Sequence, residues 1–191
     1  MNHGDVTAAL HSLGNPGRTR LLQRYFKTGP GEYGEGDLFL GITMPDARST
    51  AKRFAQLPLS EVCELLHSPF HEVRMVALLI LCHQYGRGSE ELRKEIYRIY
   101  LENTRFINNW DLVDSSAPNI VGPYLEKRDR ATLYSLAASP LVWERRIAIM
   151  ATFHFIKQKD LTRTYFHNLR EQYGFAGCKA GSTRVFASIK K

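Results

Sequence analysis

The sequence has few cysteines, no long apolar run and no export signal, and each absence excludes a class of protein. Its three cysteines, Cys63, Cys82 and Cys178, have no ligand-like spacing, which argues against a disulfide framework and against a zinc cluster. The longest apolar run, residues 76–82, is far shorter than a membrane span. Because the first residues form neither a basic nor an apolar segment, we expect a soluble, unexported protein of the cytoplasm.

The composition is that of one globular domain with an excess of positive charge. The 191 residues are 43% hydrophobic and 24% charged, which is enough apolar material for a single core across residues 1–191. The formal net charge of +7 favours an anionic partner, with nucleic acid ahead of a membrane surface. Basic charge alone is weak support for either partner, because many solvated surfaces are basic.

Helical periodicity covers almost the whole chain, so the sequence predicts an all-α fold. Pro45 is typical of a first helical turn, and only residues 39–42 have a strand-like pattern, which we interpret as an extended link into that helix. No alternating strand pair with a hairpin turn stands out. The expected helices occupy residues 45–54, 59–67, 72–85, 90–103, 110–125, 130–138, 143–157 and 161–173.

Part of this helical pattern is repeated. Residues 65–79 align with residues 136–150 at a shift of 71, which places Ser68 on Ser139 and Arg74 on Arg145. Because two antiparallel helices with their turns need about half that length, a third unit should lie between the two copies. The sequence therefore predicts a helical-repeat solenoid.

The middle unit holds the strongest functional signal, the segment NNWDLVDSSAP at residues 108–118. Trp110 and Asp114 lie one helical turn apart on a single face. An electron-rich ring beside an anion suits a cationic centre. Arg146 follows Trp110 by 36 residues, so the two should occupy nearly equivalent places in adjacent repeats.

Equivalent positions of a solenoid line one concave surface, so several of these residues are expected to share a groove. They are Arg74, Trp110, Asp114, Arg145 and Arg146. Each has a structural alternative: the arginines could pair with carboxylates between repeats, and Asp114 or Asp111 could cap or bridge a neighbouring helix. Trp110 could also be a core residue, and we keep that interpretation for Trp143.

Two other segments suggest ligand binding without the residues to support it. The Gly-rich run at 27–37 has no strong strand before it and no Gly-Lys-Ser/Thr ending, and its carboxylates would repel phosphate. His67 and His71 have the spacing of metal ligands on a helix, but Pro69 breaks that helix. We expect no metal and no cofactor. The Gly-rich run is better interpreted as a flexible connector that leads a helical hairpin into the repeats, pinned to the core by Tyr25, Phe26, Tyr33 and Phe39.

Four segments together resemble the AlkD-type DNA alkylation repair family, which consists of helical HEAT-like DNA glycosylases. They are residues 25–48, 67–81, 103–122 and 139–156, and the similarity extends over about 21–160. The resemblance implies a right-handed superhelix of antiparallel HEAT-like repeats with a concave basic groove. It also implies a monomeric base excision repair enzyme for duplex DNA containing alkylated bases, associated with the nucleoid when bound.

The same resemblance assigns roles to particular residues. The site of the family maps onto Trp110, Asp114 and Arg146, and a DNA backbone contact maps onto Arg48. A purine alkylated at N3 or N7 is cationic, and its departure leaves an oxocarbenium-like sugar. Asp114 would stabilise that cation and hold the attacking water, Trp110 would offer a cation–π surface, and Arg146 would bind a phosphate and orient Asp114. Arg74 and Arg145 are further candidates for DNA contact.

The C-terminal end departs from the family pattern. Relatives continue into a last repeat with a Lys-Ala-x-Gly-Trp helix, whereas this chain runs through FAGCKAGSTRVFASIKK. We therefore expect an atypical or truncated end after about residue 173, with excision activity impaired if the missing tryptophan matters. The alternative function is a non-catalytic helical-repeat module that binds DNA or a protein through a basic groove.

Overall fold

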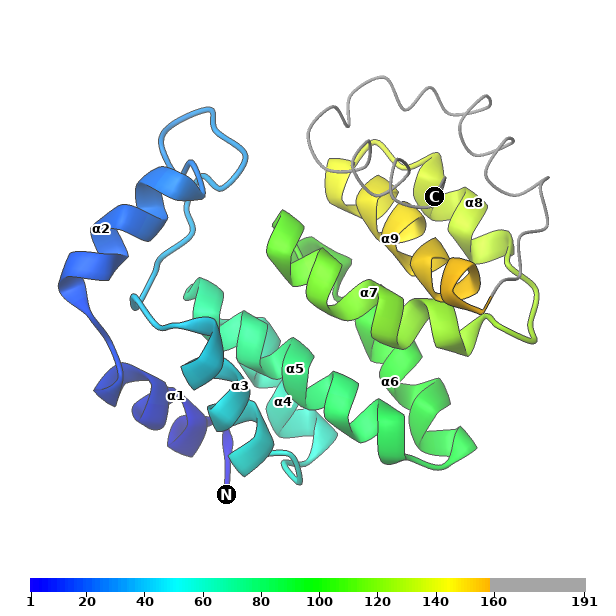
Figure 1. Ribbon diagram of the computed structural model, residues 1–191, viewed down its shortest axis with the longest axis horizontal. Coiled ribbons are helices and arrows are strands. Elements are labelled where there is room, and N and C mark those ends of the chain that lie inside the picture. Colours follow the sequence, from blue (N-terminus) through cyan, green and yellow to red (C-terminus); the bar gives the residue numbers. More distant parts are fainter. Residues whose placement is uncertain (159–191) are drawn as a thin grey trace.

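The computed structural model describes residues 1–158, and in that range it is helical without any named strand (Figure 1). The expectation of an all-α fold is confirmed. In chain order the elements are α1 (His3–Ser12), α2 (Pro16–Tyr25), α3 (Met44–Arg53), α4 (Leu59–Leu66), α5 (His71–Arg87), α6 (Glu90–Glu102), the 3-10 turn η1 (Thr104–Phe106), α7 (Trp110–Tyr124), α8 (Ala131–Ala137) and α9 (Val142–Lys157).

Side-chain caps fix where several helices begin. Asn2 makes a reciprocal capping box with Asp5 at the start of α1, and the Asn15 side chain accepts the backbone N–H of Arg18 at the start of α2. Thr43 caps α3 in the same way, directly before the Met44–Pro45 turn that the sequence predicted as a helix start. These residues satisfy backbone N–H groups that the first turn of a helix leaves without a partner.

The helices from α4 onward form pairs that pack side by side. α4 packs on α5, α6 on α7, and α8 on α9, and each pair is joined by a short connection. The second helices also contact one another, α5 with α7 and α7 with α9, so they make one continuous layer (Figure 1). α3 packs against α5 at the N-terminal end of that layer. The site therefore takes its residues from neighbouring helices of a single layer.

The 71-residue repeat is confirmed by matching contacts at its two turns. The Arg74 Nη1 donates to the Ser68 carbonyl oxygen at 2.9 Å, and the Arg145 Nη1 donates to the Ser139 carbonyl oxygen at 2.8 Å. Both serine hydroxyls accept a backbone N–H two residues later, from Phe70 at 3.2 Å and from Leu141 at 3.1 Å. The shared sequence pattern thus specifies a shared turn between the two helices of a pair.

The core lies mainly along α5, whose apolar run is buried on nearly every side. Leu78, Ile80 and Leu81 are fully buried, and each contributes about 1.5–3 kcal/mol relative to an exposed side chain. Trp143 is partly buried and packs against this core, which agrees with the core interpretation kept for it. α7 and α9 approach closely because Gly122 places no side chain between them.

An extended link joins the Gly-rich segment to α3, as residues 39–42 predicted. Leu38 forms an isolated parallel bridge with Phe70, and the Glu72 carboxylate accepts the backbone N–H groups of Leu40, Gly41 and Ile42 at 2.8–3.2 Å. Gly41 has a φ of 82°, and a Cβ there would lie 2.2 Å from the Asn15 carbonyl oxygen. Only glycine lets α2 start this close to the link.

Two expectations about the C-terminal end fall outside residues 1–158. These are the helix at 161–173 and the atypical or truncated end after about residue 173. Among the described helices, none has the length and apolar character needed to cross a bilayer.

Candidate functional site

Asp114 on α7 and Arg146 on α9 form a bidentate ion pair across the contact between these helices. Arg146 Nε donates to Asp114 Oδ1 and Arg146 Nη2 donates to Asp114 Oδ2, both at 2.7 Å. The Asp114 side chain keeps 29% of its surface exposed, and the Arg146 side chain keeps 24%. A planar guanidinium fork holds a carboxylate in one orientation, and charge-assisted bonds of this kind are strong. The pair is thus ordered yet accessible from solvent.

Trp110 opens α7, one helical turn before Asp114. The Asn109 side chain fixes this start by accepting the Trp110 backbone N–H at 2.8 Å. The indole is half-buried: it stacks on Phe26 with ring centres 5.5 Å apart and meets the edge of Tyr25 at 6.1 Å. Neither Trp110 nor Asp114 is sealed inside the helix stack.

Tyr25 at the end of α2 and Tyr33 of the Gly-rich segment lie against the tryptophans instead of in the core. Tyr25 is 62% exposed and Tyr33 is 39% exposed, so of the four aromatic residues expected to pin this segment, only Phe26 and Phe39 are buried. Tyr33 meets the edge of Trp143 at 5.7 Å. Burial raises the pKa of the Tyr33 phenol, and a hydrogen bond from Trp110 offsets part of that effect. The phenol therefore stays un-ionised at neutral pH beside the indole.

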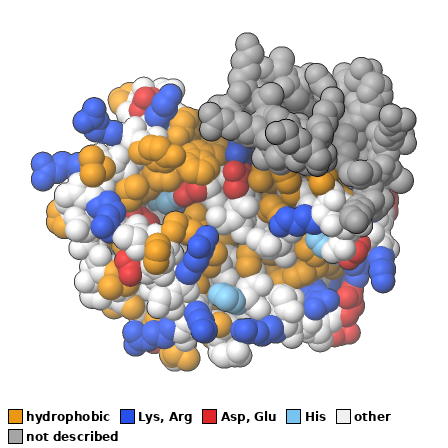
Figure 2. All heavy atoms as spheres, viewed as in Figure 1, with side chains coloured by type: hydrophobic (Ala, Val, Ile, Leu, Met, Phe, Trp, Pro, Cys, Tyr) orange, Lys and Arg blue, Asp and Glu red, His pale blue; other side chains and the backbone are white. Residues whose placement is uncertain are grey.

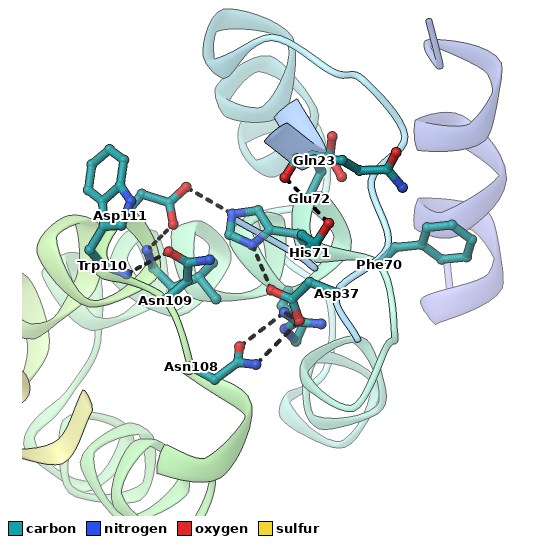
Figure 3. A network of polar contacts seen from close by, with 12 residues as sticks. Gln23, Asp37, Phe70, His71, Glu72, Asn108, Asn109, Trp110 and Asp111 are labelled. Carbon is teal, nitrogen blue, oxygen red and sulfur yellow. Dashed lines mark hydrogen bonds and ion pairs between the residues drawn. The ribbon is translucent and has the colours of Figure 1, made fainter. Parts of the chain in front are cut away.

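A buried polar network lies behind the tryptophan (Figure 3). The Arg74 Nη2 donates to Asp37 Oδ1 at 2.7 Å and to Asn108 Oδ1 at 3.0 Å. The His71 ring lies between two carboxylates, with Nε2 2.8 Å from Asp111 Oδ2 and Nδ1 3.4 Å from Asp37 Oδ2. The network therefore ties the Gly-rich segment, α5 and the start of α7 together.

The two central groups of the network shift each other's titration. Burial alone would lower the pKa of His71, but the hydrogen bonds that its ring donates to Asp111 and Asp37 outweigh this effect, and the pKa is raised above its usual range. Burial would raise the pKa of Asp37, but His71 and the Arg74 guanidinium outweigh it and hold that pKa below its usual range. Each shift favours the charged form of its group.

The predicted arginines occupy three different environments. Arg74 is buried and pairs with Asp37, which is the carboxylate alternative that the sequence left open and corrects the expectation that it faces an open groove. Arg145 is half-buried and donates to the carbonyl oxygens of Ser139 and Pro140, both at 2.8 Å. Arg48 is exposed on α3. The structure thus brings Arg146 together with Asp114 and leaves the other arginines outside that pair.

Sequence reasoning missed the role of His71, which it considered only as a metal ligand with His67. A signal was present: at the repeat shift of 71, His71 aligns with Val142 and Glu72 aligns with Trp143. In the structure His71 and Glu72 are buried, whereas Val142 is exposed, and buried polar side chains need hydrogen-bond partners. Asp111, considered as a structural alternative to Asp114, pairs with His71.

The described residues offer no arrangement of metal ligands. Within residues 1–158, no group of three or more histidine, cysteine, aspartate or glutamate side chains could hold a metal ion. Burial raises the pKa of the Cys82 thiol to about 12, so this sulfur is protonated at neutral pH.

Comparison with known proteins gives one finding for most of the chain. Residues 6–171 match a family model described as DNA alkylation repair enzyme. No curated protein matches the sequence.

Proposed function

Since the chain belongs to the DNA alkylation repair enzyme family, we propose that it is a DNA glycosylase acting in base excision repair. Its substrates are positively charged N3- or N7-alkylated purines in duplex DNA. The observation that carries this proposal is the part-exposed Asp114–Arg146 pair, one helical turn from the half-buried indole of Trp110. An ordered anion beside an electron-rich ring suits a reaction in which positive charge develops on a sugar.

The proposed reaction is a hydrolysis that needs only water. The N-glycosidic bond breaks with its electron pair passing to the cationic base, which leaves as a neutral purine. A water oxygen then bonds to the anomeric carbon of the sugar, and its proton passes to the surrounding water. Asp114 stabilises the oxocarbenium-like sugar and orients the water, and the face of Trp110 stabilises the same cation.

Arg146 serves as the positioning residue for Asp114 and as a contact for a DNA phosphate. Two parallel bonds at 2.7 Å fix the plane of the carboxylate, so little reorganisation is needed when the sugar becomes charged. A guanidinium that already pairs with a carboxylate also draws a nearby phosphate toward the site.

The wider surface supports an anionic partner. The net charge is +7, and Lys and Arg are the predominant charged side chains on the N-terminal part of the face shown in Figure 2. We propose that the described helix pairs form a right-handed HEAT-like superhelix whose concave side binds one duplex, with the protein as a monomer. Arg48 and Arg145 are the proposed DNA backbone contacts.

A non-catalytic DNA-binding module is the second candidate. The observation in its favour is that both Asp114 oxygens accept N–H groups from Arg146, which neutralises part of the charge that a sugar cation would require. In that case the pair would be structural and the surface would bind DNA without releasing a base.

Base release from methylated duplex DNA separates the two candidates. We expect the protein to release 3-methyladenine and 7-methylguanine, and Asp114→Asn to abolish release while leaving the fold intact, because it removes a charge and keeps the shape. Unchanged turnover in Asp114→Asn would remove Asp114 from the mechanism. DNA binding with a salt-dependent affinity but no release would establish the non-catalytic module instead.

A further inference from the structure

The buried network around His71 contains an arrangement that only a charged imidazole satisfies. The two ring nitrogens of His71 face different carboxylates. Nε2 lies 2.8 Å from the Asp111 carboxylate, and Nδ1 lies 3.4 Å from the Asp37 carboxylate. An ionised carboxylate only accepts hydrogen bonds, and a neutral imidazole has one N–H to donate. A neutral ring would therefore point a lone pair at one of the two anions. With both nitrogens protonated, each carboxylate receives a donor.

The charges of the cluster balance when His71 is an imidazolium ion. The charged groups that face its ring are Asp37 from the Gly-rich segment, Asp111 from α7 and Arg74 from α5. Glu72, next along α5, directs its carboxylate to the backbone of residues 40–42 instead. Two anions and two cations make a neutral group, which is the least costly way to bury four charges. The raised pKa of His71 agrees with this state.

The cluster is coupled to Trp110 by two independent routes. Along the chain, Asp111 is the next residue after Trp110, in the same first turn of α7. Through space, the His71 ring stacks on Phe39 at 4.7 Å and lies 4.9 Å from Phe26, which itself stacks on Trp110 at 5.5 Å. Figure 3 shows His71 between Asp37 and Asp111, with the indole beyond Asp111.

We propose that His71 is a positioning residue for Trp110: as an imidazolium ion bridging Asp37 and Asp111, it locks the first turn of α7 and sets the indole relative to Asp114. The positional part stands on the network alone, and its effect on base excision rests on the proposed function. As the pH rises through the folded-state pKa of His71, the ring loses one N–H donor and one of its two hydrogen bonds to the carboxylates breaks. The first turn of α7 is then no longer held in place, and the Trp110 indole moves relative to Asp114.

Nuclear magnetic resonance tests the positional part without any substrate. We expect the His71 ring to remain an imidazolium ion at neutral pH, and the Trp110 indole N–H signal to shift at higher pH with the midpoint of His71. In Asp111→Asn, which keeps the shape of the partner and removes its charge, both midpoints should fall together. A neutral His71 ring in the wild type at neutral pH, or an indole signal that ignores the His71 titration, would overturn the proposal.

Single-turnover base release at saturating DNA tests the functional part. We expect His71→Gln to slow release by about tenfold to a hundredfold with little change in DNA affinity, since a small displacement of a reacting group has such an effect. The matched control is His67→Gln, because His67 is exposed and bonds the neutral Asn103 side chain at 2.7 Å. His67→Gln should release base at the wild-type rate.

The pH profile separates positioning from a merely structural role. In Asp111→Asn, release should decline at a lower pH than in the wild type, whereas a structural defect would lower the rate equally at every pH. Should His71→Gln fail to fold by circular dichroism, Asp111→Asn carries the test alone. Absence of base release from the wild type would refute the proposed function while the indole titration still decides the role of His71.

Discussion

Two arginine–aspartate pairs of the same chemistry lie in very different surroundings. In the Arg74–Asp37 pair the bonding atoms are 2.7 Å apart and both side chains are only 5% exposed. In the Arg146–Asp114 pair two bonds of 2.7 Å are formed, but about a quarter of each side chain remains accessible. Arg74 aligns with Arg145 in the repeat, one residue before Arg146. Nearly the same repeat position therefore supports a sealed pair in one copy and an open pair in the other.

The difference arises from the segment that precedes α3. Asp37 reaches Arg74 because the extended link is held on α5 by Glu72 and by the Leu38–Phe70 bridge, and this link covers the start of α5. Asp114 reaches Arg146 directly from α7, with solvent on one side. The repeat sets where an arginine lies, and the segment that covers it decides whether its ion pair is buried or open to solvent.

Removing the arginine of each pair is the strongest way to break this comparison. We expect Arg74→Met to lower the free energy of unfolding by about 3–5 kcal/mol, because it removes the guanidinium partner of the buried Asp37 charge. Arg146→Met should cost only about 1 kcal/mol, because this pair is part-exposed and water reaches Asp114. Urea unfolding of both variants measures the difference. Equal losses in the two variants would mean that burial does not distinguish the pairs.

A methyl group added between α7 and α9 should lengthen the Asp114–Arg146 contact and leave the buried Arg74–Asp37 pair unchanged. A Cβ at Gly122 would lie 2.4 Å from the Ala151 carbonyl oxygen, so Gly122→Ala forces these helices apart. We expect a loss of about 1–3 kcal/mol from overpacking, although alanine ordinarily favours a helix. Thermal unfolding measures the loss, and the Asp114–Arg146 contact should lengthen in a crystal structure of the variant.

Gly86 of α5 provides the matched control for that substitution. Nothing lies within 4 Å of a Cβ added there, and the residue is exposed. Gly86→Ala should therefore raise the stability by about 0.5–1 kcal/mol, through the smaller conformational freedom of the unfolded chain. A stabilising Gly122→Ala would show that α7 and α9 can separate at no cost.

The sequence predicted the features that depend on a local period. Seven expected helices, from the one that begins near Pro45 to the one that ends near Lys157, agree with α3 to α9 within a few residues. The repeated Ser68 and Arg74 pattern predicted a shared turn because both residues belong to one turn and one helix. Asp114 and Arg146 were placed together by a repeat spacing and a family resemblance.

What the sequence missed depends on contacts between segments far apart in the chain. His71 meets Asp37 and Asp111, which lie 34 and 40 residues away, so no single helical pattern contains the network. The Gly-rich segment was expected to bury Tyr25 and Tyr33 because aromatic residues prefer the core. Its turns at Gly31 and Gly36 have φ values of 77° and 85°, and such turns direct side chains in ways that composition does not predict.

A third arginine extends the comparison to a fully exposed charge and gives the smallest expected effect. Arg48 is exposed on α3, so Arg48→Ala should leave the stability unchanged within about 0.5 kcal/mol. If Arg48 contacts one phosphate, the slope of log affinity against log salt should become shallower by about 0.9. The control is Lys94→Ala, which removes an exposed positive charge from α6, the first helix of the α6–α7 pair. This variant should leave the slope unchanged. Fluorescence anisotropy with a short unmodified duplex measures both slopes. Equal slopes for Arg48→Ala and the wild type would exclude Arg48 from the DNA contact, whatever the outcome of the excision assay.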